Sequence, residues 1–179
     1  MHVMKCLLTG AFTCVVILAP ALARAQNPMM ASIKAQHDMA KGYVLKTAEV
    51  IPENLYSFKA TPDVRSIAQL IGHIADATTS ICGGAGGATV TPAGAEKSMT
   101  TKAQLSKALA DAFASCDKVI ASMTDAQAME TTKFFVGGQS PRGMIIAFNT
   151  AHTFEHYGNL VTYMRLNKIV PPSTAATGK

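Results

Sequence analysis

The chain has 179 residues, a formal net charge of +5 at pH 7, 49% hydrophobic residues and four cysteines. This length suits a single domain with a substantial core. The basic residues are scattered, without a run of like charge or a basic cluster interleaved with aromatic residues, so the sequence argues against a nucleic-acid-binding protein.

The first 25 residues have the pattern of a secretory signal peptide. Residues 1–5 form a short, positively charged segment, and residues 6–18 form an apolar run that Pro20 ends. Alanines occupy the −3 and −1 positions of a cleavage site after Ala25. We therefore expect a mature domain of residues 26–179, periplasmic or secreted, with no membrane span after cleavage. An uncleaved anchor is the alternative, which the short apolar run disfavours because a spanning helix needs about 20 residues.

Four long stretches of the mature chain have the apolar periodicity of amphipathic helices, at about residues 30–51, 64–82, 101–123 and 140–167. The segment between the second and third, GGAGGATVTPAGAEKS, is rich in glycine and proline and predicts a long connector without regular structure. With no internal repeat and no series of strands, the pattern predicts an all-α four-helix bundle with one long crossover connection.

Two shorter features precede the fourth helix. The segment TTKFFVGGQ, residues 131–139, is β-prone and predicts a small extended arm. Ser140 followed by Pro141 predicts a helix cap and a proline in the first helical position.

Removal of the signal peptide would leave two cysteines, Cys82 and Cys116. In an oxidising compartment such a pair permits one disulfide, which would close a loop of about 35 residues and stabilise the fold by up to about 4 kcal/mol. Two buried thiols that only pack are the alternative. A catalytic cysteine is disfavoured, because Cys82 and His73 project from opposite sides of one helix.

His152 and His156 are four residues apart in AHTFEHYG, so on a helix they project from one face on adjacent turns. Such a pair can bind one divalent metal ion, with a third ligand supplied from elsewhere in the fold. At 100° per residue the pair lies on the core-facing stripe, where an imidazole needs a partner. The spacing leaves two interpretations open, a metal site or two core histidines bonded to hydroxyl or carbonyl groups.

Three further polar residues lie on the predicted helices. His73, in LIGHIADAT, falls at the boundary of the buried face, where it lines a pocket or is a surface residue. Asp76, one turn later, either orients an imidazole or is a solvated acid. His37 is central on the apolar face of the first helix, as a core residue or as a fourth ligand that would close the site.

Three segments of the chain resemble the DinB/YfiT-like superfamily, and most closely its exported branch: NLYSFKATPDVRSIAQLIGHIAD, FASCDKVIASMTD and GGQSPRGMIIAFNTAHTFEHYGNLVTYMRLNKIVPP. The resemblance covers essentially the whole mature chain, and the last segment is its most specific part. It implies a four-helix bundle and a site for a divalent metal ion, usually zinc or nickel, formed here by His73, His152 and His156. Better-understood relatives use the metal to activate a thiol in transfer or isomerisation, while many have no assigned reaction.

Three protein ligands would leave coordination positions open for water or substrate, which is typical of catalytic sites. The sequence is compatible with a metal-dependent transferase or hydrolase acting on a small molecule, such as a thiol, and equally with a non-catalytic metal- or ligand-binding bundle. Glu155 is the candidate general base, although its helical phase also suits a surface role. The motif also fits the H-x-x-E-H peptidase pattern, but no later acidic residue exists to supply a third ligand. A homodimer is compatible with the sequence.

Overall fold

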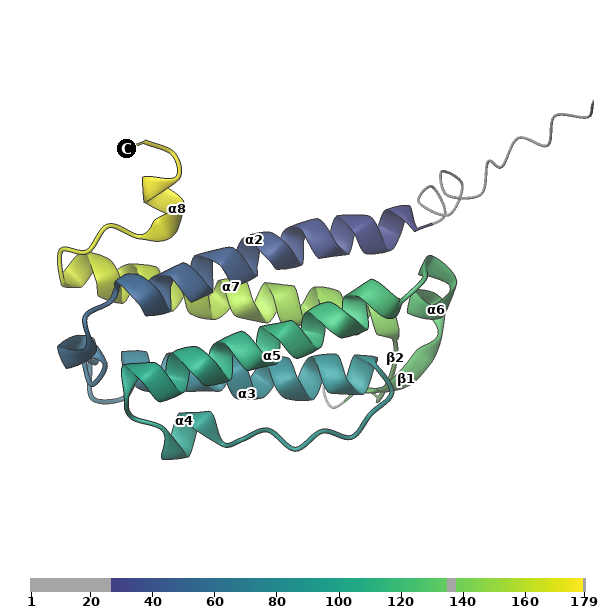
Figure 1. The fold of residues 1–179 in the computed structure, drawn as a ribbon, viewed down its shortest axis with the longest axis horizontal. Helices are drawn as coiled ribbons and strands as arrows, with labels where there is room; N and C mark the ends of the chain where they lie inside the picture. Colours follow the sequence, from purple (N-terminus) through teal and green to yellow (C-terminus); the bar gives the residue numbers. More distant parts are fainter. Residues whose placement is uncertain (1–26, 135–137, 179) are drawn as a thin grey trace, which may run out of the picture.

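The computed structural model describes residues 27–134 and 138–178, so the expected signal peptide lies outside the described residues. Four long helices form a bundle (Figure 1): α2 (Pro28–Val50), α3 (Ile67–Ala85), α5 (Lys102–Ser122) and α7 (Arg142–Leu166). Helices α3 and α2 each contact both α5 and α7. The predicted all-α four-helix bundle is confirmed. None of the helices in the described residues is long and apolar enough to cross a membrane.

The connector, residues 86–101, is the predicted long crossover. Figure 1 shows that α3 ends at one end of the bundle and α5 begins at the other, so the connector returns along the outside of α3. The shorter elements are η1 (Glu53–Leu55), α4 (Ala95–Ser98), α6 (Asp125–Met129), β1 (Thr131–Phe134), β2 (Gly138–Pro141) and α8 (Pro172–Ala175).

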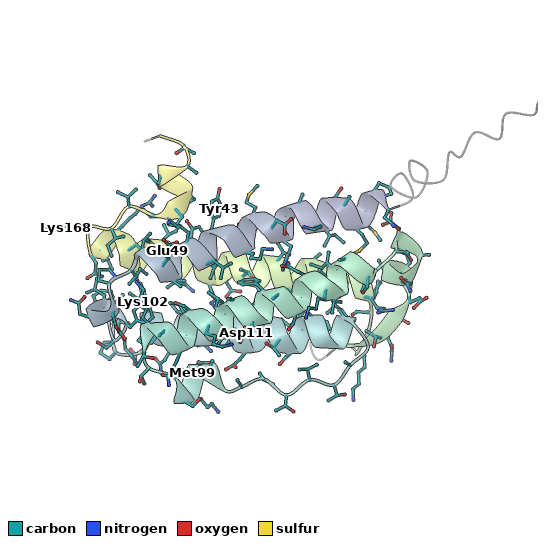
Figure 2. The ribbon with its side chains drawn as sticks, viewed as in Figure 1. Tyr43, Glu49, Met99, Lys102, Asp111 and Lys168 are labelled. Atoms are coloured by element: carbon teal, nitrogen blue, oxygen red, sulfur yellow. A yellow bond between two sulfur atoms is a disulfide. The ribbon has the colours of Figure 1, made fainter. Side chains whose placement is uncertain are left out.

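Local hydrogen bonds fix the ends of the long helices. Helix α3 begins later than predicted because Ser66 and Gln69 form a capping box, in which each side chain bonds the other's backbone N–H. At the start of α5, the Lys102 ammonium donates to the carbonyl oxygens of Glu49, at 2.6 Å, and Ile51, at 2.8 Å. Figure 2 shows Lys102 beside Glu49 at this end of the bundle, where a cation suits the carboxyl end of α2.

Helix α3 also ends later than predicted, because it continues through two glycines after Cys82 to Ala85. Gly83 has a packing role there. A Cβ at this position would lie 2.6 Å from the Cγ2 of Val90, so a larger residue would displace the Val90 side chain of the connector.

The predicted extended arm is a two-stranded antiparallel hairpin in which Thr132 pairs with Ser140. The predicted helix cap at Ser140 is wrong. Strand pairing takes up this residue, Pro141 becomes the N-cap, and α7 begins at Arg142. The Arg142 N–H donates to the carbonyl oxygen of Glu130, which ties the start of the helix to the hairpin.

The prediction of a connector without regular structure is wrong for residues 95–98, which form α4. The Asp76 carboxylate on α3 accepts hydrogen bonds from the backbone N–H groups of Ala95, at 2.9 Å, and Glu96, at 3.0 Å. An acid at this end of a short helix satisfies amides that lack intrahelical partners. The partner lies about twenty residues away in the sequence, so local composition could not reveal it.

The core consists of two apolar clusters, one towards each end of the bundle. The Cys82–Cys116 disulfide lies in the second cluster and joins α3 to α5, with the two Cα atoms 5.2 Å apart. The predicted disulfide is therefore confirmed. Between the clusters the described helices bury several polar side chains, which include His37, Thr78, Asn149 and Thr153. The candidate site lies next to this polar layer.

Candidate metal centre

Three histidines meet where α3 contacts α7. His73 comes from α3, and His152 and His156 come from adjacent turns of α7. The Nε2 atom of His152 lies 3.2 Å from that of His73 and 3.0 Å from that of His156. One ligand nitrogen from each ring lies within 4.8 Å of the other two, a spacing at which one metal ion can be held.

The outward nitrogen of His73 is held by a carboxylate. The Glu96 Oε2 atom lies 2.8 Å from the His73 Nδ1 atom. A carboxylate accepts hydrogen bonds, so Nδ1 of a neutral His73 carries the proton and its Nε2 lone pair points at the other two rings. Burial opposes ionisation of Glu96, but hydrogen bonds from Arg65 and His73 outweigh this and lower the pKa of its carboxyl.

Two features of α3 position Glu96. The Asp76 carboxylate caps α4, as described above, and Gly72 permits close packing of the two helices. A Cβ at Gly72 would lie 2.6 Å from the backbone nitrogen of Glu96, closer than real Cβ contacts allow. The glycine before His73 therefore brings the carboxylate of Glu96 within reach of the imidazole.

The two histidines of α7 are held in their neutral form at pH 7. Burial, followed by repulsion from His73, lowers the pKa of His152. Burial, followed by repulsion from His152 and His73, lowers the pKa of His156 to about 4. Metal coordination requires a neutral imidazole with a free lone pair, and these shifts keep the lone pairs available.

The donor set fits a divalent metal ion. Three imidazole nitrogens converge, and one shared proton cannot satisfy all three lone pairs. Imidazole suits zinc, nickel, copper and iron rather than calcium or magnesium, which prefer oxygen ligands. The described residues place no fourth His, Cys, Asp or Glu in this cluster, so three protein ligands leave open positions.

A mainly apolar pocket of about 420 Å³ opens onto two of the histidines. We call it the histidine pocket. The His152 ring stacks on Phe148, with ring centroids 6.2 Å apart. The residues that line the histidine pocket are His73, Asp76, Ala77, Ser80, Ile81, Pro92, Phe148 and His152. A molecule in this pocket would contact His73 and His152.

A model of the DinB superfamily matches residues 36–160, which include α3 and α5, most of α2 and α7, and the three histidines. The chain belongs to the DinB superfamily. A crystal structure of a DinB-like protein from Bacillus cereus ATCC 10987 has a TM-score of 0.66 and 17% sequence identity to this chain, and the match covers 74% of this chain and 89% of that one. At this identity the likeness shows the DinB fold alone. Curated proteins give no match.

The structure brings together the three histidines that the DinB resemblance implied, and places the other candidates elsewhere. His37 does not close the site, since its Nε2 atom lies 3.0 Å from Asp117 Oδ1. Asp38 and Asp117 could form a second ligand cluster with His37, but the Lys41 ammonium bonds both carboxylates and supplies the positive charge itself.

Asp76 and Glu155 are the two acidic residues for which the sequence suggested a role at the site. Asp76 is partly exposed and bonds no imidazole in the described residues, because its carboxylate accepts from the first backbone amides of α4. Glu155 is exposed on α7 and is absent from the lining of the histidine pocket, and its proposed role as general base stays a prediction. Sequence reasoning missed Glu96, because its contact with His73 depends on the path of the connector.

We expect Glu96→Gln to weaken zinc binding about tenfold, because it removes the negative charge that fixes the His73 tautomer. Competition with a chromophoric chelator measures this affinity. Glu49→Gln, a matched change at an exposed glutamate that pairs with Lys46, should leave the affinity unchanged. Equal affinities for the wild type and Glu96→Gln would contradict the positioning role. Gly72→Ala should weaken binding similarly by displacing α4.

We expect the metal-free protein to lose stability as the pH falls from about 6.5 towards 4. The unfolded chain protonates His156 near its ordinary pKa of 6.5, whereas the native chain does so only at about 4. This difference is equivalent to at most about 3.5 kcal/mol, fully lost below the native pKa. Urea denaturation with chelator at pH 7.5 and 4.5 measures it. His156→Gln should show a smaller loss, and an identical loss would contradict the shift.

Proposed function

We propose that this DinB protein binds one zinc or nickel ion through His73, His152 and His156, and that it is a metal-dependent transferase or hydrolase acting on a small molecule. The observation that carries the proposal is the convergence of three imidazoles beside an open pocket. When bound, a divalent ion polarises a water or a thiol and lowers its pKa, which supplies a nucleophile near neutral pH.

The chain's own residues have three tasks in this proposal. Glu96 holds the His73 ring so that Nε2 faces the ligand cluster. The apolar walls of the histidine pocket would contact the apolar part of a bound substrate. Glu155, on the same helix as two ligands, is the candidate general base, acting at the rim through a water molecule.

A non-catalytic role, binding a metal or a ligand, is the second candidate. One observation favours it. Asp76 is the only carboxylate in the lining of the histidine pocket, and backbone amides already occupy its oxygens, so the described pocket lacks an obvious general base. A nucleophile that is activated by the metal ion alone would not need a general base. The two candidates therefore differ in whether the bound metal ion activates a nucleophile.

The test uses two chromogenic reactions on zinc- and nickel-loaded mature protein. One is the conjugation of glutathione with 1-chloro-2,4-dinitrobenzene, and the other is the hydrolysis of p-nitrophenyl acetate. An enzyme should accelerate at least one reaction in a metal-dependent way, and His152→Ala should abolish the acceleration. Glu155→Gln should then lower the rate without lowering metal affinity. Rates that equal those of free metal ion in both reactions would favour the non-catalytic candidate.

We also propose that the protein is exported to the periplasm or beyond. The support is the signal pattern of residues 1–25 together with the Cys82–Cys116 disulfide, since disulfides persist mainly in oxidising compartments. N-terminal sequencing of protein from the periplasmic fraction should give a chain that begins at Gln26. Recovery of the full-length chain in the cytoplasm would contradict export.

A further inference from the structure

Two adjacent pockets lie along α3 between the candidate metal centre and the β-hairpin, and together we call them the groove. The histidine pocket forms its first part, and a second pocket of about 350 Å³ forms the rest. Ser80 and Ile81 line both pockets and so mark their junction. The residues of α3 along the groove run from His73 to Gly84, which at 1.5 Å per residue is about 16 Å.

Aromatic and aliphatic side chains form the floor of this groove. The His152 ring stacks on Phe148, and Phe148 meets Phe134 edge-to-face with centroids 5.2 Å apart. The three rings thus lead from the metal centre to the hairpin. Ile81 and Ile145 add aliphatic surface along the same path.

The connector forms the opposite wall and is held at both ends. Val90 packs on Gly83, and the Ala88 N–H donates to the carbonyl oxygen of Gly83 at 2.9 Å. Asp76 holds the other end through α4. Between these anchors successive residues alternate sides: Val90 and Pro92 line the groove, while Thr91 and Ala93 line a separate pocket towards α5. The wall is therefore anchored by the protein's own contacts at both ends.

Charged groups are nearly absent from the groove within the described residues. The histidine pocket has no lysine or arginine in its lining, and both carboxylate oxygens of Asp76 are occupied by amides. Lys133 lies only at the far end, exposed on β1. Arg65 and Lys59 line a polar pocket that includes Glu96, on the other side of His73. A polar or highly charged molecule would find few partners in the groove.

We propose that the substrate is a small molecule with an elongated apolar body, alkyl or aryl, and a single metal-binding group at one end. This inference rests on the proposed metal centre and deepens it. The binding group lies at His73 and His152, and the body extends past Phe148 and the Ser80 junction towards Phe134. The groove thus selects substrates by the length and polarity of the part that does not react.

The test is a series of straight-chain hydroxamic acids, from acetohydroxamic to decanohydroxamic acid, added to cobalt-loaded mature protein. The hydroxamate binds the metal, and the visible absorption of cobalt reports binding for every chain length. Affinity should rise about fourfold per methylene over the first several carbons, because each added methylene is buried. It should level off once the chain fills the groove.

Ser80→Phe should block the junction of the two pockets. It should remove the gain in affinity for the longer acids, so that the affinity no longer rises with chain length. Thr79→Phe is the matched control, because Thr79 is the neighbour of Ser80 but lines the pocket towards α5. In this variant the rise in affinity with chain length should persist. The helical circular-dichroism spectrum and the bound cobalt content show that each variant is folded and metal-loaded.

Three outcomes would overturn the inference, and they are distinguishable. If acetohydroxamate changes the cobalt spectrum but affinity does not depend on chain length in the wild type, the metal centre stands and the groove assignment fails. If the protein binds no cobalt, the proposed metal centre fails and the groove assignment fails with it. A chain-length series that survives Ser80→Phe unchanged would also count against the groove.

Discussion

His152→Ala is expected to lower the affinity for zinc by about a hundredfold to a thousandfold while the helical circular-dichroism spectrum is retained. Its Nε2 atom lies within 3.2 Å of the Nε2 atoms of both His73 and His156, so this ring is the centre of the ligand cluster. Four-ligand zinc sites contribute about 10–16 kcal/mol in total, so one ligand is equivalent to about 3 kcal/mol.

Competition with a chromophoric chelator measures the affinity of each variant. His37→Gln is the matched control, since it replaces a buried histidine that contacts Asp117 and Phe113 and lies outside the cluster. This control should bind zinc as tightly as the wild type. If His152→Ala retained wild-type affinity, or if His37→Gln lost it, the assignment of the ligands would be wrong.

Reduction of the Cys82–Cys116 disulfide is expected to lower the melting temperature by about 10 °C. The two cysteines are 34 residues apart, and closing a loop of this length stabilises a fold by up to about 4 kcal/mol in the chain-entropy account. For a domain of this size each kcal/mol shifts the melting temperature by about 2–4 °C. Thermal unfolding with and without reductant measures the change.

The double variant Cys82→Ala/Cys116→Ala provides the control for the disulfide. Its melting temperature should not respond to reductant, although the lost sulfur atoms will lower it in both conditions because both side chains are buried. Titration of two free thiols in the unfolded, non-reduced wild type would contradict the disulfide. A melting temperature that is insensitive to full reduction would contradict its contribution to stability.

The helices could be predicted from the sequence because each buries one periodic apolar face, and that pattern is local. The partners of the histidines are not local. His73 lies at a helical boundary whose phase alone suits a pocket or a surface, and the DinB resemblance indicated that it joins the pair on α7. Spacing predicted that His152 and His156 share a face, but not that a third imidazole would meet them.

Glu96 could not be predicted for a different reason. It belongs to a segment rich in glycine and proline, in which local propensity is weak. Its position depends on the Asp76 carboxylate and on the missing side chain of Gly72, both on α3. Ser140 shows the same effect, because its pairing with Thr132 overrides its preference for a helix cap. Tertiary contacts decide all of these positions.

X-ray absorption spectroscopy with elemental analysis on the purified mature protein tests the metal centre most directly. We predict one zinc or nickel ion per chain, three imidazole nitrogens at about 2.0–2.1 Å for zinc, and one or two further light-atom ligands from solvent. His152→Ala should lose this signal. A protein that retains no stoichiometric metal after reconstitution, or a closed shell of four protein ligands, would contradict the open three-histidine centre.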